Sequence, residues 1–510
     1  MHKSLNRESV YIILIVLISI FLSISYSHIQ RAVEGGLVIS EIVKYPDGFS
    51  PMKAYYFNSW TFLHQLSAFF LKLDLSVINT SRLILFFSTF FYFIGVYFVI
   101  KSISLSSILA FFTALIVMVF RKNFGDVDYP TVIFSVHSYG IMSLALATFV
   151  FGLIANGNLF FAGFTSIFLI SIHPVVGLWV TIIFLLSIFL SKFFMKESNS
   201  NKRIFYGMFF SLIFVFLSFF LFYINMVEKI SFDEEIYATY MQNWETHRIN
   251  YGSPYLIHYE YLAKSFFLIF TCFVGFKYFT KNQTDQCRLM LLMVFISSLL
   301  SILIYIIYKL SPNLFPNIVT SLMPTRFAII HSVIGWPIII SFFYILTHSF
   351  LVKRNLNPIY ASILILFILF FYSISHYKNI LVRTDHFFSN LSSNKVVDSN
   401  IFWERVKKTK TEGFVLTSAL SAYPVFHKGF KPVIFIPDQI DFVPYHPYTV
   451  GQIKEIIENI YDIPFNRPPK DPQISESMIK IIFENKTYEK WNKIFNKFNI
   501  DCLIVPSNKK

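Results

Sequence analysis

The segment from Arg82 to Lys101 reads RLILFFSTFFYFIGVYFVIK, and no charged residue interrupts it between its two basic ends. An α-helix rises about 1.5 Å per residue, so a segment of this length can cross the hydrocarbon core of a bilayer, which is about 30 Å thick. Similar apolar segments lie at 10–28, 104–121, 132–154, 157–172, 175–195, 204–225, 262–280, 288–309, 327–350 and 357–375. This ladder predicts a polytopic α-helical membrane protein with about eleven transmembrane helices.

The composition agrees with a membrane protein. The chain has 510 residues, of which 55% are hydrophobic and only 14% are charged, whereas a soluble domain carries roughly 25% charged residues. The net charge of +14 comes from Lys and Arg in short connections, which is typical of orientation signals. We therefore expect the lipid bilayer, and no nucleic acid, as a partner. The three cysteines are too few and too scattered for a disulfide framework or a metal site.

The distribution of basic residues predicts which side of the membrane each connection faces. With a cytoplasmic N-terminus, the three connections that are richest in Lys and Arg lie on the cytoplasmic side, as the positive-inside rule requires. Arg121 and Lys122 are the exception, because they lie on the outer side. The first apolar run, 11–25, lacks a cleavage site and is read as an anchor. The membrane module, 1–375, then has the outer loops 29–81 (the first loop), 122–131, 226–261 and 310–326. The polar tail that follows also lies outside.

The tail, 376–510, begins with a polar, linker-like stretch, 376–412. Within 413–510, the short apolar runs GFVLTS, PVIFIP and DCLIVP, at 413–418, 432–437 and 501–506, predict strands. The segments 450–461, 475–483 and 488–498 have helical patterns. We expect a small C-terminal exoplasmic α/β domain. Its aromatic, proline-rich segment 438–448 reads as a structural cover, and the alternative is a substrate-contacting loop.

The first loop carries three candidate catalytic acids, Glu34, Glu41 and Asp47. Glu41 follows an apolar run, which would bring it to the membrane surface, and Asp47 sits in a Pro-Asp-Gly turn signature. The residues alone do not choose among the three. Further along this loop, 55–75 has large apolar side chains at helical spacing but too many polar ones to span a bilayer. That pattern predicts an amphipathic helix lying in the interface.

Asp126 and Asp128 form a DxD pattern in the short second outer loop. Two carboxylates can hold a divalent cation such as Mg²⁺ or Mn²⁺ while leaving positions open for phosphate oxygens. They could instead divide into a base and a residue that orients it. The alternative is a solvated turn before Tyr129 and Pro130.

Five other ionisable residues are candidates for binding the lipid phosphate or the substrate. Arg326 lies at the outer end of the tenth segment, where a permanent positive charge suits a lipid phosphate. His331 lies in the same segment, His137 in the fourth segment, His173 at an outer turn and His247 in the long outer loop. Ionisable groups at membrane depth face a cavity or a partner, although each could also be a satisfied structural residue.

The layout resembles the C-type (GT-C) superfamily of polytopic membrane glycosyltransferases, and the likeness covers most of the chain. Its elements are the acidic first loop with an interfacial helix, the DxD-like second loop, the later outer arginine and the C-terminal exoplasmic domain. The family's pair of adjacent first-loop acids is absent here, as is the tryptophan-rich signature of its oligosaccharyltransferase tails.

The resemblance implies transfer of a sugar from a polyprenyl-phosphate-linked donor to a glycan, lipid or protein acceptor. It also implies a multi-pass protein of the bacterial inner (plasma) membrane. A first-loop acid would be the general base, and Arg326, with or without a metal at Asp126 and Asp128, would stabilise the leaving phosphate.

Three other functions compete with this reading. An O-antigen polymerase or ligase-like enzyme would depend on outer-loop arginines, which are scarce. A non-enzymatic envelope-glycan assembly protein would use the tail as a binding module. A transporter would be expected to contain internal repeats, and none is evident in the sequence.

The predicted topology has a direct test. A cysteine introduced into the tail should react with a membrane-impermeant thiol reagent in intact cells, because the tail is expected outside. A cysteine introduced into 196–203 is the control and should react only after the cells are permeabilised. Protection of the tail cysteine would contradict the orientation.

Overall fold

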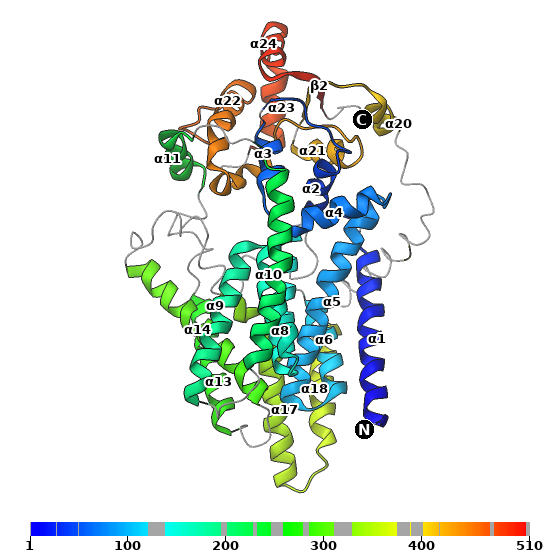
Figure 1. The fold of residues 1–510 in the computed structure, drawn as a ribbon, viewed down its shortest axis with the longest axis vertical. Coiled ribbons are helices and arrows are strands. Elements are labelled where there is room, and N and C mark those ends of the chain that lie inside the picture. The colour runs from blue at the N-terminus through cyan, green and yellow to red at the C-terminus, as the bar shows by residue number, and fades with distance from the viewer. Residues whose placement is uncertain are drawn as a thin grey trace.

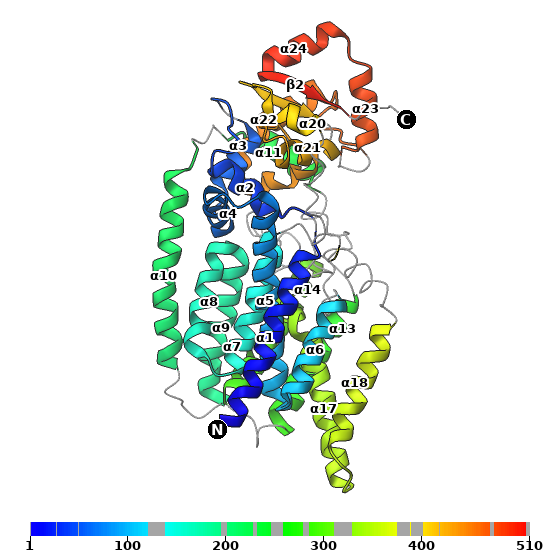
Figure 2. The same cartoon turned by 90° about the vertical axis from the view of Figure 1, so that its right-hand side faces the viewer.

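The computed structural model describes residues 2–26, 28–48, 50–120, 138–194, 201–227, 232–245, 259–278, 285–310, 329–374, 388, 401–417, 419–469 and 474–505. These residues form a bundle of long helices with a second layer on one end, as Figures 1 and 2 show. The bundle contains α1 (His2–Ile24), α5 (Val77–Ser104), α6 (Ser107–Phe120), α7 (Ser138–Ala155), α8 (Leu159–Ile172), α9 (Pro174–Phe194), α10 (Asn201–Ile224), α13 (Tyr259–Tyr278), α14 (Asp285–Leu310), η2 (Ile329–Ile334), α17 (Gly335–Lys353) and α18 (Ile359–Ile374).

We call the second layer the cap, and it combines residues 31–72, 234–245 and 401–505. Its elements are α2 (Arg31–Ile39), α3 (Pro51–Asn58), α4 (Phe62–Lys72), α11 (Glu234–Asn243), α20 (Ile401–Lys408), β1 (Phe414–Thr417), α21 (Ala419–His427), η3 (Pro437–Tyr445), η4 (Pro447–Thr449), α22 (Val450–Ile460), α23 (Glu476–Glu484), α24 (Tyr488–Phe498) and β2 (Ile500–Ile504). The N-terminal end of α1 and the cap lie at opposite ends of the bundle (Figure 1).

Each apolar segment of the sequence coincides with a helix of the bundle. Within the described residues, six helices are long and apolar enough to cross a membrane. They are α5, α7, α9, α10, α14 and α17. Large apolar side chains project outward from the bundle, among them Phe209 and Phe216 of α10, which are 64% and 67% exposed. Such a surface is suited to lipid. The chain is therefore a helical membrane protein, while eleven spans and the side that the cap faces stay predictions.

Close helix contacts in the bundle depend on glycine. A Cβ atom added to Gly152 of α7 would lie 2.6 Å from the carbonyl oxygen of Gly95 in α5. A Cβ on Gly95 would lie 2.7 Å from the backbone of Thr148. In lipid, helices associate through this kind of backbone approach, because no hydrophobic force drives them together. The contact fixes α7 against α5, and a serine near the start of each helix binds the start of α2.

The α/β elements expected in the tail are present with one correction. β1 and β2 pair in parallel, and α22, α23 and α24 lie where the helical patterns predict them. The strand expected at 432–437 is wrong, because only Val433 forms a bridge, to Val415. Proline explains its shortness. Pro432 has no N–H to donate to a ladder, and Pro437 begins the 3-10 helix η3.

Three segments that are distant in sequence share the core of the cap. From the second segment, the Trp244 indole donates a 2.7 Å hydrogen bond to the carbonyl of Phe465, and the Tyr240 hydroxyl donates one of 2.9 Å to the carbonyl of Ile440. From the first loop, the Tyr45 hydroxyl donates to the carbonyl of Val433. The tail is thus packed against both segments.

The aromatic segment 438–448 packs against the first loop. The rings of Phe442 and Tyr55 lie 4.9 Å apart, His446 contacts the hydroxyl of Ser59 at 2.9 Å, and Asn58 donates to the hydroxyl of Tyr448 at 2.7 Å. These contacts agree with the reading of this segment as a structural cover, although the surface it covers belongs to the first loop.

The amphipathic helix predicted over 55–75 is divided into two helices. α3 ends at Asn58, and Thr61 caps the start of α4 by accepting a hydrogen bond from the Leu63 amide. The Thr61 hydroxyl also donates to the carbonyl of Ile172 in α8. The break lets α3 pack against the tail while α4 lies along α2.

The glycine contact in the bundle gives a stability prediction. Gly152→Ala should lower the free energy of unfolding by about 1–3 kcal/mol, because two backbones would have to move apart. Thermal unfolding of the purified protein in detergent measures the change. Gly451→Ala is the control, since a Cβ on Gly451 would meet nothing within 4 Å. Equal melting temperatures for the two variants would contradict the close contact.

Candidate functional site

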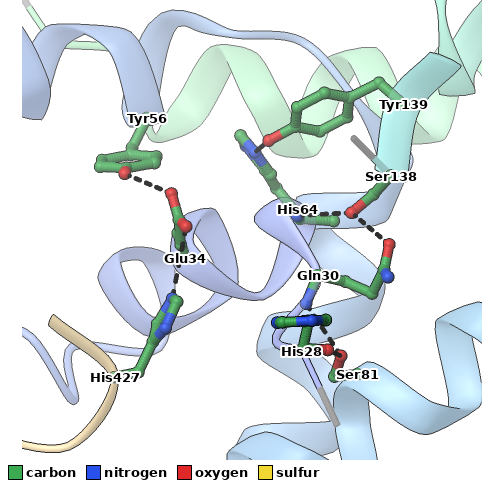
Figure 3. Close-up of polar contacts among 10 residues, drawn as sticks. His28, Gln30, Glu34, Tyr56, His64, Ser81, Ser138, Tyr139 and His427 are labelled. Atoms are coloured by element: carbon green, nitrogen blue, oxygen red, sulfur yellow. Dashed lines mark hydrogen bonds and ion pairs between the residues drawn. The ribbon is translucent and has the colours of Figure 1, made fainter. Parts of the chain in front are cut away.

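A buried carboxylate lies where the first loop meets the tail. Glu34 of α2 is only 2% exposed. Its Oε2 accepts a 2.9 Å hydrogen bond from the Tyr56 hydroxyl of α3, and its Oε1 lies 3.3 Å from Nε2 of His427, the last residue of α21. Figure 3 shows the carboxylate between these two side chains. Because a buried charge is costly unless it is paired, these contacts make the site a functional candidate.

Serines at the ends of two bundle helices anchor the start of α2. The Gln30 amide donates to the Ser81 hydroxyl of α5 at 2.8 Å, and the Ala32 amide donates to the Ser138 hydroxyl of α7 at 3.0 Å. Ser138 donates in turn to the Gln30 side chain at 3.2 Å (Figure 3). The site is therefore fixed to the end of the bundle.

Two glycines let α4 approach α2 closely. A Cβ on Gly35 would lie 2.3 Å from the His64 ring, and a Cβ on Gly36 would lie 2.4 Å from Ser67. His64 is thereby held beside Glu34, with its Nε2 at 2.6 Å from the Tyr139 hydroxyl of α7. The sequence Glu34-Gly35-Gly36 thus places a carboxylate at a tight helix contact.

The tail side of the site is formed by α21. The ring of Phe426 lies 5.5 Å from that of Tyr56, and the ring of Tyr423 lies 5.3 Å from the guanidinium carbon of Arg31. His427 follows directly on Phe426, so docking of α21 brings its imidazole to Glu34. The tail therefore contributes a side chain to the site and also covers it.

The electrostatics keep Glu34 ionised. Burial raises the pKa of this carboxyl, but the contact with and charge of His427, the charge of Arg31 and the hydrogen bond from Tyr56 outweigh burial. The pKa of Glu34 therefore lies below its usual value. Burial lowers the pKa of the Arg31 guanidinium, but its electrostatic interactions with Glu34 and with Tyr423, Tyr55 and Asp441 together raise it by more, so the net shift is upward.

His64 and three tyrosines of the site stay neutral near pH 7. Burial lowers the pKa of His64 to about 4, although the charge of Glu34 partly opposes the shift. Burial also raises the pKa of the Tyr45, Tyr55 and Tyr56 phenols above their usual value. Glu34 is thus an ionised acceptor beside the Arg31 guanidinium, with these neutral side chains and His427 around it.

The structure separates the three first-loop acids. Glu34 is buried, whereas Glu41 and Asp47 are exposed. Glu41 follows the end of α2 in the left-handed region, at φ 61°, and its amide donates to the carbonyl of Val38. That backbone geometry is typical of a helix C-terminus. Of the three candidate catalytic acids, only Glu34 contacts other titratable side chains in the cap.

Two of the candidate histidines lie apart from Glu34 and have their own partners. His173 ends α8 and accepts a weak 3.5 Å hydrogen bond from the Val176 amide. His331 is 1% exposed and lies between the hydroxyls of Ser265 and Ser297, each at 3.2 Å. These contacts fit satisfied structural histidines.

The remaining candidates, Asp126, Asp128, His137, His247 and Arg326, lie outside the described residues. The cation expected at Asp126 and Asp128 therefore stays a prediction. In the part of the chain that the structure describes, no three His, Cys, Asp or Glu side chains gather in a way that could hold a metal ion.

Sequence reasoning missed the partners of Glu34, namely Arg31, Tyr56, His64 and His427. The pair Gly35-Gly36 is the one local signal for the first-loop part of the site, because adjacent glycines inside a helix mark a close contact. His427 belongs to no recognisable motif, and only the docking of α21 reveals its role.

Comparison with known proteins adds no family to this description. No model of a known protein family matches the chain, and no curated protein matches it significantly.

His64 makes acid sensitivity a testable property of the site. An unfolded histidine takes up a proton near pH 6.5, whereas folded His64 does so only near pH 4. Lowering the pH through this window should therefore destabilise the fold, by up to about 3 kcal/mol from His64 alone. His64→Gln should flatten the dependence of melting temperature on pH between 6.5 and 4. His28→Gln, at an exposed position, is the control, and equal slopes for both variants would contradict the buried neutral imidazole.

Proposed function

We propose that the protein is a membrane glycosyltransferase that moves a sugar from a polyprenyl-phosphate-linked donor to an acceptor at the junction of the first loop and the tail. Glu34 is the general base in this proposal. The observation that carries it is the buried Glu34 carboxylate, which is held by a tyrosine of its own loop and a histidine of the tail.

The chemistry requires an ionised carboxylate close to the acceptor hydroxyl. Glu34 takes the hydroxyl proton, and the acceptor oxygen forms a bond to the anomeric carbon of the sugar. The bond between that carbon and the phosphate oxygen breaks. The bonding electron pair stays on the phosphate oxygen, and the polyprenyl phosphate leaves. The lowered pKa of Glu34 supports this role, because the base is ionised before the acceptor arrives.

His427 acts as a positioning residue in the proposed reaction. Its Nε2 lies at Oε1 of Glu34, while Oε2 is bound by Tyr56. The acceptor hydroxyl would replace the imidazole at Oε1, which opens the carboxylate to substrate while Tyr56 keeps it oriented. The tail therefore controls access to the base.

A non-enzymatic assembly protein is the second candidate function. The almost complete burial of Glu34 favours it, because a buried carboxylate with two partners can also serve as a clamp between the first loop and the tail. The two functions differ in what replacement of Glu34 does. A clamp variant loses stability, whereas a transferase variant loses transfer and remains folded.

Glu34→Gln should lower the rate of sugar transfer by about 10²–10⁴-fold, the usual contribution of a general base. Transfer from a panel of radiolabelled polyprenyl-phosphate sugars into membranes that contain the protein measures the effect. Glu235→Gln, which neutralises an exposed acid of the cap, should transfer normally. Wild-type transfer by Glu34→Gln would rule out the base. A large fall in melting temperature with no transfer by the wild type would favour the clamp.

His427→Gln should shift the acidic limb of the pH–rate profile to higher pH. The reason is that His427 lowers the pKa of Glu34, so its removal lets the base take up a proton at a higher pH. His446→Gln is the matched control, because His446 is a buried histidine of the tail that contacts Ser59. An unchanged acidic limb in His427→Gln would contradict the positioning role.

A further inference from the structure

Arg31 is a largely buried cation with an unused hydrogen-bond donor. Its guanidinium lies over the Tyr423 ring, 5.3 Å from the ring centre. Its Nε is buried and meets no acceptor in the described part of the chain. Arg31 as a whole nevertheless retains some exposed surface. A buried donor without an acceptor costs free energy, and an incoming anion would supply that acceptor.

The neighbouring carboxylates do not supply an acceptor for the Arg31 Nε. Glu34 and Asp441 lie within electrostatic reach of Arg31, but among the described residues neither forms an ion pair with it. Both oxygens of Glu34 already have partners in Tyr56 and His427. The guanidinium is therefore attracted to two carboxylates, while its Nε still lacks an acceptor in the described part of the chain.

The position of Arg31 suggests where that acceptor comes from. Arg31 lies between Gln30, which is bound to Ser81 of α5, and Ala32, which is bound to Ser138 of α7. Both α5 and α7 are candidate membrane spans. The backbone of Arg31 is thus held at the ends of two spans, close to the level at which the phosphate of a lipid-anchored molecule lies.

We propose that Arg31 binds the phosphate of a lipid-linked phosphodiester. An arginine fork suits two phosphate oxygens at once. The inference deepens the proposed function and rests on it, since the phosphodiester is the intact sugar donor.

The two carboxylates add a preference for low charge. An anion at Arg31 also feels the repulsion of Glu34 and Asp441, and this repulsion grows with each negative charge that the ligand carries. A phosphodiester carries one negative charge, whereas a phosphate monoester carries nearly two at neutral pH. The site therefore favours the intact donor over the lipid monophosphate released by transfer, which assists product release.

Binding measurements on the full-length protein in phosphatidylcholine nanodiscs test the inference. The probes are methyl farnesyl phosphate as the diester, farnesyl phosphate as the monoester, inorganic phosphate, and farnesol as the uncharged control. Titration calorimetry should rank the diester above the monoester and the monoester above inorganic phosphate. Arg31→Gln should weaken diester binding by about tenfold or more and leave farnesol unchanged. Arg31→Lys should bind at an intermediate level, because lysine keeps the charge and loses the fork.

Arg405→Gln is the matched control, because Arg405 is an exposed arginine of the cap, and it should bind the diester like the wild type. Diester binding by a folded Arg31→Gln at wild-type strength would overturn the site. Tighter binding of the monoester would overturn the charge preference. Full competition by phosphatidylglycerol would assign the site to bulk lipid and overturn its link to the donor.

A second measurement covers the case in which Arg31→Gln does not fold. In the wild-type protein, methyl farnesyl phosphate should protect Arg31 from phenylglyoxal, as read by mass spectrometry, and Arg405 should react with or without the ligand. Unprotected Arg31 at a saturating probe concentration would overturn the site. Neither experiment involves sugar transfer. Arg31-dependent binding without any transfer would therefore refute the glycosyltransferase and leave the phosphate site standing.

Discussion

Burial of one carboxylate constrains the whole cap. The buried carboxylate of Glu34 is not solvated by water, so protein groups must stabilise its charge. These groups are Arg31 of α2, Tyr56 of α3 and His427 of α21. Tyr56 can reach it only because the chain breaks between α3 and α4, and His427 only because α21 docks on the first loop. The tail, the first loop and the bundle end are therefore arranged around a single charge.

Glycine provides the precision that this arrangement needs. Gly35 and Gly36 bring α4 against α2 and hold His64 beside Glu34, while Gly95 and Gly152 bring α7 against α5. The serines at the ends of these bundle helices then hold the start of α2. A chain of short backbone contacts thus runs from the bundle to the site. Such contacts tolerate little movement, because packed interiors resist even one added methyl group.

Hydropathy alone predicts the helices of the bundle, because a long apolar segment in lipid must satisfy its own backbone hydrogen bonds and therefore forms a helix. The tail helices also follow from their local period, as α24 illustrates at Tyr488–Phe498. The strand expected at 432–437 fails because neighbouring prolines limit pairing. The site could be predicted only in part. Glu34 looks no different from Glu41 or Asp47 in the sequence, since burial is decided by which helix α4 covers. The pairing with His427 is invisible because it arises from tertiary docking.

The pairing of Glu34 with His427 also sets an order of events during biosynthesis. α2 is synthesised long before α21 has been translated. Until α21 is present, Glu34 has no contact with His427 and is solvated by water. Its burial becomes favourable only when the late-synthesised α21 arrives. A ribosome that stalls before α21 therefore releases a chain whose first loop stays hydrated and open. The complete site can therefore form only after translation has passed α21.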